Sequence, residues 1–276
     1  MQRVPHLQGE NQIARLRQAA EKLALRISNV QDVAGVVFMG GLARGFMDKH
    51  SDIDIMVFLR KENNVTRKQI RQIDSEEQQL AGVDMDVEVH TIEAYRKKKW
   101  NEIDRWSFSK ADIVFDSNDM VKQLLDGKLI VSNEFWIRRI AVCGEYVKWY
   151  CCPFSKGVDT MAEAWIDRGD LLSAQYCLNY SLDTMLRIVF ALNKEFVPPA
   201  KWKLFHSYNL RWLPANYKTL LEEILTTQTF SEGDFQCRLT ALRALWRGIL
   251  LKIGKETGLK PDTMSKYYVE KILRQG

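Results

Sequence analysis

Two glycines and two aspartates, about ten residues apart, constrain this chain more than any other feature. The apolar run 35–39 predicts a strand that ends at Gly40 and Gly41, and Asp52 and Asp54 alternate with isoleucines at the start of a second predicted strand. Strand side chains alternate between faces, so both carboxylates point the same way, ~6.5–7 Å apart along the strand. Like charges on one face repel each other, and a divalent cation is the simplest compensation. The pattern therefore predicts a magnesium site beside a glycine turn that a phosphate can approach.

A later segment offers a third acid for the same site. Residues 83–90 alternate strictly, with valines and a methionine on one face and Asp84, Asp86, Glu88 and His90 on the other. A half-buried strand explains the apolar face, but three acids in a row are unfavourable neighbours unless they are solvated or bind cations. We expect Asp84 to be solvated and keep Asp86 and Glu88 as candidate metal ligands. His90 is a candidate for substrate contact.

The joint pattern resembles the signature of the DNA polymerase β-like nucleotidyltransferase superfamily. That signature has an apolar residue and two small residues, here at 39–41, then a gap and an Asp-Ile-Asp-Ile run, here at 52–55. The resemblance implies an enzyme that transfers a nucleoside monophosphate from a nucleoside triphosphate to a hydroxyl group and releases pyrophosphate. It also implies two magnesium ions, which Asp52, Asp54 and a third carboxylate would hold.

The chain also resembles kanamycin-type aminoglycoside nucleotidyltransferases, and this resemblance implies roles for two further residues. Segment 87–89 is similar to the corresponding strand of those enzymes, which makes Glu88 the first choice for the third metal ligand and Asp86 the second. A glutamate of their helical domain is the general base, and Glu145 is the matching candidate on a predicted helix here. A largely apolar face would raise the pKa of this carboxyl, as a base near neutral pH requires. The alternative is a surface glutamate paired with Lys148.

The same resemblance implies roles in nucleotide binding. The backbone at Gly40 and Gly41 would approach the β- and γ-phosphates closely, because no Cβ stands in the way. Arg44 and Ser51 are candidate phosphate donors, and for Arg44 the alternative of a surface arginine on a short helix has equal weight. Trp106 is expected to pack in the interior rather than to stack on a base or sugar.

Composition narrows the class of protein. The chain has 276 residues, of which 46% are hydrophobic, so it is long enough for two globular domains. A formal net charge of +5 permits polyphosphate binding, but with no nucleic-acid motif we expect no nucleic-acid partner. No apolar run reaches ~18–20 residues and no signal-peptide core is present, so we expect a cytoplasmic protein without a membrane span. Five cysteines without Cys-x-x-Cys spacing indicate neither a zinc site nor a disulfide framework.

The pattern of elements changes near residue 131. We predict an α+β fold: a nucleotidyltransferase catalytic domain over residues 1–130, with a small mixed sheet flanked by helices, and an all-helical substrate-binding domain over 131–276. Gly82 is expected to end one helix of the first domain and Gly127 to break another. The expected strands cover 35–39, 53–59, 83–91 and 111–116; the expected helices cover 11–28, 66–80, 92–100, 119–125, 135–150, 159–166, 171–192, 215–226, 234–253 and 263–273. Residues 192–202 are expected to end a helix and form a proline-stiffened loop, from which Lys201 could reach a triphosphate or substrate.

The leading functional hypothesis is transfer of AMP from ATP to a small hydroxylated acceptor, possible examples being aminoglycoside- or lincosamide-like antibiotics, which would confer antibiotic resistance. A cationic acceptor would need an acidic pocket, and Asp84, Asp86, Glu93 and Glu145 could supply one. The alternatives are a protein-modifying, AMPylating nucleotidyltransferase of toxin–antitoxin type, a polynucleotide-extending enzyme and a non-catalytic nucleotide-binding relative. The sequence leaves the acceptor, the preferred nucleotide and the oligomeric state open, and it permits a homodimer.

Overall fold

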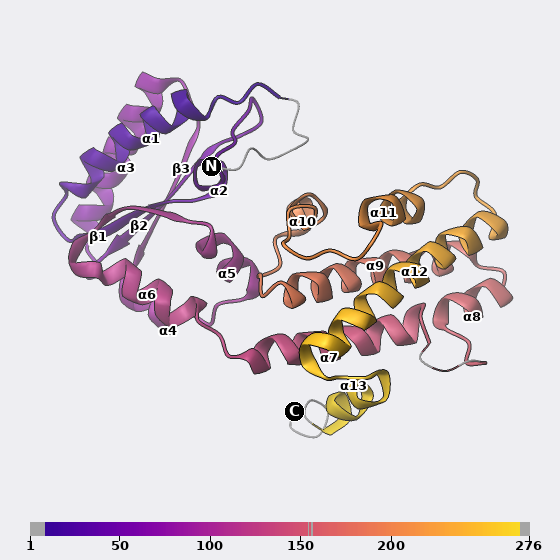
Figure 1. The fold of residues 1–276 in the computed structure, drawn as a ribbon. Coiled ribbons are helices and arrows are strands. Elements are labelled where there is room, and N and C mark those ends of the chain that lie inside the picture. The colour runs from indigo at the N-terminus through magenta and orange to yellow at the C-terminus, as the bar shows by residue number, and fades with distance from the viewer. Residues whose placement is uncertain (1–8, 154, 156, 271–276) are drawn as a thin grey trace. The chain divides into compact units, whose positions relative to one another are not determined.

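The structure, a computed structural model, describes residues 9–153, 155 and 157–270. The chain divides into two compact units, Met1–Ile130 and Val131–Gly276. The first unit combines a sheet with helices, and the second is built from helices (Figure 1). The predicted fold class is therefore confirmed: a mixed sheet in the N-terminal part and a helical C-terminal region.

One four-stranded mixed sheet forms the centre of the first unit. Its strand order is β3-β2-β1-β4; β1 runs antiparallel to β2 and to β4, whereas β2 and β3 are parallel. The β2–α3–β3 segment is a crossover connection, which is what parallel neighbours require. The strands are β1 (Val33–Phe38), β2 (Ile53–Leu59), β3 (Met85–Thr91) and β4 (Asp112–Asp116).

Helices cover both faces of this sheet and enclose two separate apolar cores. The core beneath α1 and α3 includes Ile53 and Ile55 of β2, and the core beneath α4, α5 and α6 includes Met56 and Phe58 of the same strand. Alternation along β2 thus supplies both cores. The helices are α1 (Ile13–Ser28), α2 (Gly40–Arg44), α3 (Asn64–Ala81), α4 (Ile92–Lys97), α5 (Glu102–Ser109) and α6 (Met120–Leu129), with a 3₁₀ turn, η1 (Ser117–Asp119), before α6.

Local signals explain most of these boundaries, with two corrections. Asn63 caps α3 by accepting hydrogen bonds from the next turn, and Gly82 ends α3 in the left-handed region at φ 61°, as predicted. Gly127 does not break α6, because a single glycine costs only about 1 kcal/mol and apolar residues earlier in the helix are buried against the sheet. Helix α5 was not predicted; it is a short helix whose start is fixed by a capping box between Asn101 and Asp104.

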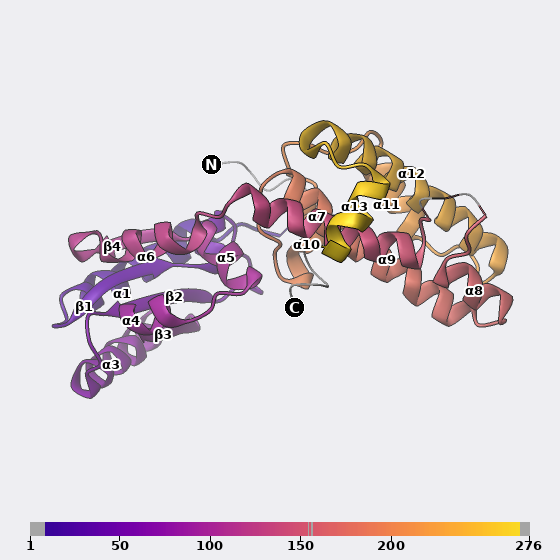
Figure 2. The ribbon, with the colours of Figure 1, turned by 90° about the horizontal axis from the view of Figure 1, so that it is seen from below.

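The second unit packs around one long helix. Helix α9 contacts α7, α8, α10 and α12, and it is buried along most of its length (Figure 2). The helices are α7 (Asn133–Tyr150), α8 (Met161–Asp167), α9 (Leu171–Leu192), α10 (Ala200–Ser207), α11 (Tyr217–Leu225), α12 (Glu232–Thr257) and α13 (Pro261–Tyr268). The end of the predicted helix over 263–273 lies outside the described residues.

Helix α9 ends at Leu192 and residues 193–199 form the predicted proline-containing loop, but a helix that was not predicted, α10, begins at Ala200. Pro199 occupies its N-cap, a place where proline is tolerated because the first helical N–H groups have no partner within the helix. Lys203, on the buried side of α10, forms an ion pair with Asp183 of α9. Lys201, the residue singled out by sequence, is exposed.

Most of the cysteines are packed as small apolar groups. All five cysteines are free thiols, and four of them are buried. Burial raises the pKa of the Cys151 thiol to about 12, so this side chain stays protonated and packs as an apolar group. Among the described residues, no helix combines the length and apolar character needed to cross a bilayer.

Candidate functional site

The glycine turn and the carboxylate of Asp54 are in direct contact. The backbone N–H of Met39, at the end of β1, donates a hydrogen bond to the carbonyl oxygen of Asp54 (3.0 Å), which fixes the turn beside β2. Gly40 has φ 51°, and a Cβ built on it would lie 1.7 Å from Oδ2 of Asp54. Only a residue without a side chain fits there, for both steric and conformational reasons. Gly41 is also confined, since a Cβ would lie 2.8 Å from Cγ of Met47.

The two aspartates stand at the start of β2. Asp52 directly precedes the strand and is exposed, whereas Asp54 is the second strand residue and is partly buried. Because side chains alternate, Asp54 shares its face with Met56 and Phe58, which belong to the core beneath α4, α5 and α6. The carboxylates therefore lie at the end of that face, next to the glycine turn.

The parallel pairing of β2 and β3 decides between the two candidates for the third carboxylate. Asp54 is the register partner of Asp86, whereas Glu88 is the partner of Met56. Register partners in a parallel pair point to the same face, so Asp86 stands directly across from Asp54 and Glu88 lies ~6.5–7 Å further along the strand. The register favours Asp86, the second choice of the sequence analysis, over Glu88, the first. Asp84 is exposed, as expected.

Glu88 has a different partner. Its Oε2 lies 3.1 Å from Nε2 of His90, which shares its face of β3, and the Glu88 side chain is 55% exposed. The His90 ring in turn packs against Tyr95 of α4, with ring centres 4.8 Å apart. Burial, together with the charges of Glu88 and Asp104, raises the pKa of Tyr95 to about 12, so this hydroxyl stays neutral. Glu88 and His90 thus form a surface pair that leads away from the glycine turn.

Arg44 is no simple surface arginine. It is the last residue of α2 and partly buried, and its guanidinium carbon lies 5.4 Å from the ring centre of Trp106. Burial lowers the pKa of Arg44, against the opposing attraction of Asp54 and Asp52. The positive charge is therefore within electrostatic reach of both site carboxylates. Trp106 is 3% exposed, which agrees with the expected packing role.

Ser51 already has a role within the loop. Its hydroxyl accepts a hydrogen bond from the backbone N–H of Asp48 (3.0 Å) and donates one to the Asp48 carboxylate (3.2 Å), and its backbone N–H donates to the Asp48 carbonyl (3.0 Å). These bonds close a tight turn immediately before Asp52. The structure thus gives Ser51 a part in shaping the loop.

A divalent cation suits the chemistry of these side chains. Asp52, Asp54 and Asp86 offer hard oxygen ligands at one end of two adjacent strands, which is the ligand type that magnesium prefers. Across residues 9–153, 155 and 157–270, however, no group of three His, Cys, Asp or Glu side chains is already gathered closely enough to hold a metal ion. The backbone aligns the three acids, and side-chain rotation would have to bring their oxygens together.

Glu145 lies in the helical unit and is hydrogen-bonded there. Its carboxylate accepts a hydrogen bond from the hydroxyl of Ser265 on α13 (2.5 Å) and lies 3.5 Å from Nζ of Lys148. Lys148 also donates to Ser265 (3.1 Å), so the three side chains form a closed polar cluster. The alternative pairing of Glu145 with Lys148 is therefore the one observed.

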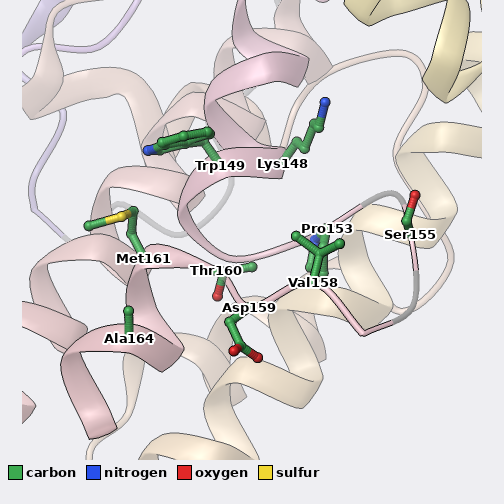
Figure 3. Close-up of a pocket in the computed structure, with 9 residues that line it drawn as sticks. All are labelled: Lys148, Trp149, Pro153, Ser155, Val158, Asp159, Thr160, Met161 and Ala164. Carbon is green, nitrogen blue, oxygen red and sulfur yellow. The ribbon is translucent and has the colours of Figure 1, made fainter. Parts of the chain in front are cut away.

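A cavity of about 270 Å³ lies beside this cluster, within the helical unit. Lys148 and Trp149, at the end of α7, line one side of it, and Met161 and Ala164 of α8 line another (Figure 3). The Trp149 side chain is 66% exposed, so an apolar ring is available at the rim. The cavity is lined mostly by apolar groups, and its polar lining residues are Lys148, Ser155, Asp159 and Thr160.

Comparison with known proteins identifies the class of the first unit. Residues 16–113 match the family model described as a nucleotidyltransferase domain, and the match spans the glycine turn and the acids of β2 and β3. This part of the chain is therefore a nucleotidyltransferase domain of the DNA polymerase β-like superfamily, as the sequence predicted. Such domains act on nucleoside triphosphates and generally use divalent metal ions.

The other comparisons are more distant. A solved structure of a nucleotidyltransferase-like protein from Exiguobacterium sibiricum 255-15 is similar to this chain with a TM-score of 0.42 and 12% sequence identity. The similarity covers 95% of this chain and 80% of that one. None of the curated proteins matches the chain.

Proposed function

We propose that this protein is a magnesium-dependent nucleotidyltransferase that transfers AMP from ATP to a hydroxyl of a small-molecule acceptor. The observation that carries the proposal is the register between β2 and β3, which aligns Asp54 with Asp86 on one face, directly beside a glycine whose missing side chain makes room for the Asp54 carboxylate. Like charges placed together in this way are unfavourable unless they bind a cation.

The reaction is an in-line displacement at the α-phosphorus. The acceptor oxygen forms a bond to phosphorus, the bond to the bridging oxygen breaks, and pyrophosphate leaves while the hydroxyl proton passes to water. Magnesium, when bound, would activate the attacking oxygen and stabilise the leaving one. Asp52, Asp54 and Asp86 would hold the metal. The backbone of the glycine turn would face the triphosphate, with the Asp54 carboxylate in the space that the missing Cβ of Gly40 leaves, and Arg44 would add positive charge beside it.

We further propose that the helical unit over 131–276 binds the acceptor. The support is its cavity of about 270 Å³ with an exposed tryptophan at the rim, since flat apolar rings commonly stack against the rings of sugars and other cyclic compounds. Aminoglycoside- and lincosamide-like antibiotics are the acceptor classes to test first. Of the four acids considered for a cationic acceptor, Glu93 and Glu145 are already paired with a lysine and Asp86 is proposed as a metal ligand, which leaves Asp84.

The test is label transfer. The protein is incubated with magnesium and α-³²P-labelled ATP, together with aminoglycosides, lincosamides, RNA or a protein extract in separate reactions. We expect label in a small molecule, and we expect Asp54→Asn to reduce transfer more than about 100-fold, since even groups that only support metal ligands are worth 10–100-fold. The matched control is Glu93→Gln, which removes an exposed acid paired with Lys97 on the surface of α4.

Each alternative predicts another result. Label in a protein band would support the AMPylating function, and label in RNA would support polynucleotide extension. If no acceptor is labelled and ATP with magnesium leaves the melting temperature unchanged, every catalytic assignment is contradicted. Full activity of Asp54→Asn would contradict the metal site alone.

A further inference from the structure

Arg44 and Trp106 come from different elements and meet at the face that carries Asp54. The Arg44 guanidinium carbon lies 5.4 Å from the centre of the Trp106 ring, within the range in which a cation is attracted by an aromatic face. Trp106 belongs to α5, one of the helices on the side of the sheet toward which Asp54 points. It is 3% exposed, so the ring is held in place by its surroundings.

The geometry of α2 directs Arg44 toward the carboxylates. Arg44 is four residues after Gly40, and residues with this spacing share one face of a helix. Gly40 is the residue whose missing Cβ makes room for Asp54, and long side chains tilt back toward the start of a helix. Leu42, two residues before Arg44, is buried in the core beneath α1 and α3, which leaves the α5 side of the sheet to Arg44.

We propose that Trp106 is a positioning residue, which holds Arg44 beside Asp52 and Asp54 as their counter-cation until a divalent metal ion arrives together with the nucleotide. The inference rests on the proposed function, because it assumes that these two aspartates bind the metal. It assigns a role to two residues outside the metal-ligand set.

The physical basis is competition between positive charges. Charges within a few ångströms of each other and shielded from water interact more strongly than they would in bulk solvent. A guanidinium held close to the aspartates therefore offsets part of the attraction that a free metal ion would feel. A bound triphosphate supplies new anionic oxygens to the same guanidinium and removes this penalty. Metal and nucleotide should consequently strengthen each other's binding, and part of that coupling should depend on Arg44.

The experiment measures binding of Mn²⁺, an oxygen-seeking ion that can be followed by electron paramagnetic resonance, without any transfer reaction. Wild type and Arg44→Met are titrated with Mn²⁺ alone and with Mn²⁺ in the presence of α,β-methylene ATP. We expect Arg44→Met to bind Mn²⁺ alone about five- to tenfold more tightly. We also expect the analogue to enhance Mn²⁺ binding less in this variant than in wild type.

Two tryptophan variants test the positioning role. Trp106→Leu removes the ring and should tighten binding of Mn²⁺ alone about two- to threefold, because the released guanidinium can turn toward solvent. Trp106→Phe keeps an aromatic face and should restore affinity close to that of wild type. Trp100→Leu is the matched control: Trp100 is also buried, but it stacks on Phe108 and bonds to the Tyr95 carbonyl, so its loss should lower the melting temperature without changing Mn²⁺ affinity.

The possible outcomes distinguish failure of the counter-cation role from failure of the proposed metal site. If wild type binds Mn²⁺ in a manner that depends on Asp54, but Arg44→Met has the same affinity, the counter-cation role is wrong and the proposed function stands. If Trp106→Leu and Trp100→Leu have the same effect on Mn²⁺ affinity, Trp106 does not position Arg44. If Asp54→Asn leaves Mn²⁺ binding unchanged, the metal site is wrong and this inference fails with it.

Discussion

Both units hold acidic side chains in ion pairs, but the N-terminal unit also aligns two acids of like charge on neighbouring strands. In the helical unit, Glu145, Glu163 and Asp183 are each bound to a lysine or arginine, and each pair ties together neighbouring turns or helices. In the N-terminal unit, the register of two strands sets Asp54 and Asp86 side by side with like charge. An acid in an ion pair stabilises the fold. Two acids of like charge on neighbouring strands lower its stability, and such arrangements are typical of sites that bind a ligand or metal ion. Ion-paired acids such as Glu163 therefore have a structural role, whereas Asp54 and Asp86 are candidates for a binding role.

Formal net charge also differs between the two units. The N-terminal unit has equal numbers of acidic and basic residues, so the helical unit carries the whole formal charge of +5. Because the N-terminal unit has no net charge, any attraction for a cation must come from the local arrangement of its acids and not from its overall charge. Substitutions that exchange an acid for its amide can therefore test the contrast, because they remove charge and keep the shape of the side chain.

The strongest test compares two acids of the same strand. We expect Asp86→Asn to reduce transfer more than about 100-fold, since Asp86 is the register partner of Asp54. Glu88→Gln should change transfer less than about threefold, because Glu88 pairs with His90 further along β3. Steady-state rates and Mn²⁺ affinity would be measured for both variants. The reverse ranking would restore Glu88 as the third ligand and contradict the argument from register.

A second test concerns the glycine turn. Gly40→Ala should lower the free energy of unfolding by about 2–4 kcal/mol and impair transfer, because the new Cβ would meet the Asp54 carboxylate and φ is positive. Gly82→Ala is a matched control: φ is 61°, but a Cβ there meets nothing within 4 Å. It should lose only the strain of about 1–2 kcal/mol and keep its activity. Urea unfolding measures both, and equal losses would show that contact with Asp54 is unimportant.

Features that depend on residues close together in the sequence were predicted, and features that depend on contacts between distant residues were not. Strands and long helices were predicted because their periodicity is local, and the polar face of β3 was predicted because alternation is local too. The short helices α5 and α10 were missed, since their boundaries depend on caps and on tertiary packing. Gly127 was given too much weight as a helix breaker for the same reason.

The site shows the same limit. The glycine turn and Asp52 with Asp54 could be found from spacing along the chain. The choice between Asp86 and Glu88 could not, because it depends on register between strands that are separated by a helix. Arg44 and Trp106 are far apart in the sequence, so no local sequence pattern could predict their contact. For Glu145, the partner Ser265 lies on another helix, so the sequence could not reveal the hydrogen bond that this carboxylate accepts.

Glu145 offers a test in the helical unit. A general base contributes typically 10²–10⁴-fold to the rate, whereas a structural acid contributes little. We expect Glu145→Gln to change transfer less than about threefold and to lower the free energy of unfolding by about 1 kcal/mol, because the hydrogen bond with Ser265 is weakened and the charge opposite Lys148 is lost. Rates and urea unfolding would be compared with wild type. A loss of 100-fold or more at unchanged stability would return Glu145 to the active site.

The smallest expected effect depends on pH. Burial raises the pKa of Glu163, but the ion pair with Arg243 and the hydrogen bonds with Thr160 outweigh it, so the pKa is lowered in the folded protein. A carboxyl whose pKa is lowered on folding contributes stability above its unfolded pKa of about 4.3, and this contribution is lost as the pH falls through the folded value. Glu163→Gln should therefore lower the free energy of unfolding by about 1 kcal/mol at pH 7 and by progressively less below pH ~4.

Urea unfolding at pH 7, 5 and 3.5 would measure this difference, with Glu222→Gln as the control. Glu222 is an exposed acid that lies 3.9 Å from Lys218 on the surface of α11, and its loss should change stability little at any pH. If Glu163→Gln lost as much stability at pH 3.5 as at pH 7, the contribution of Glu163 would come from packing and not from charge. Glu163 would then no longer be an example of an acid that stabilises the helical unit through its charge.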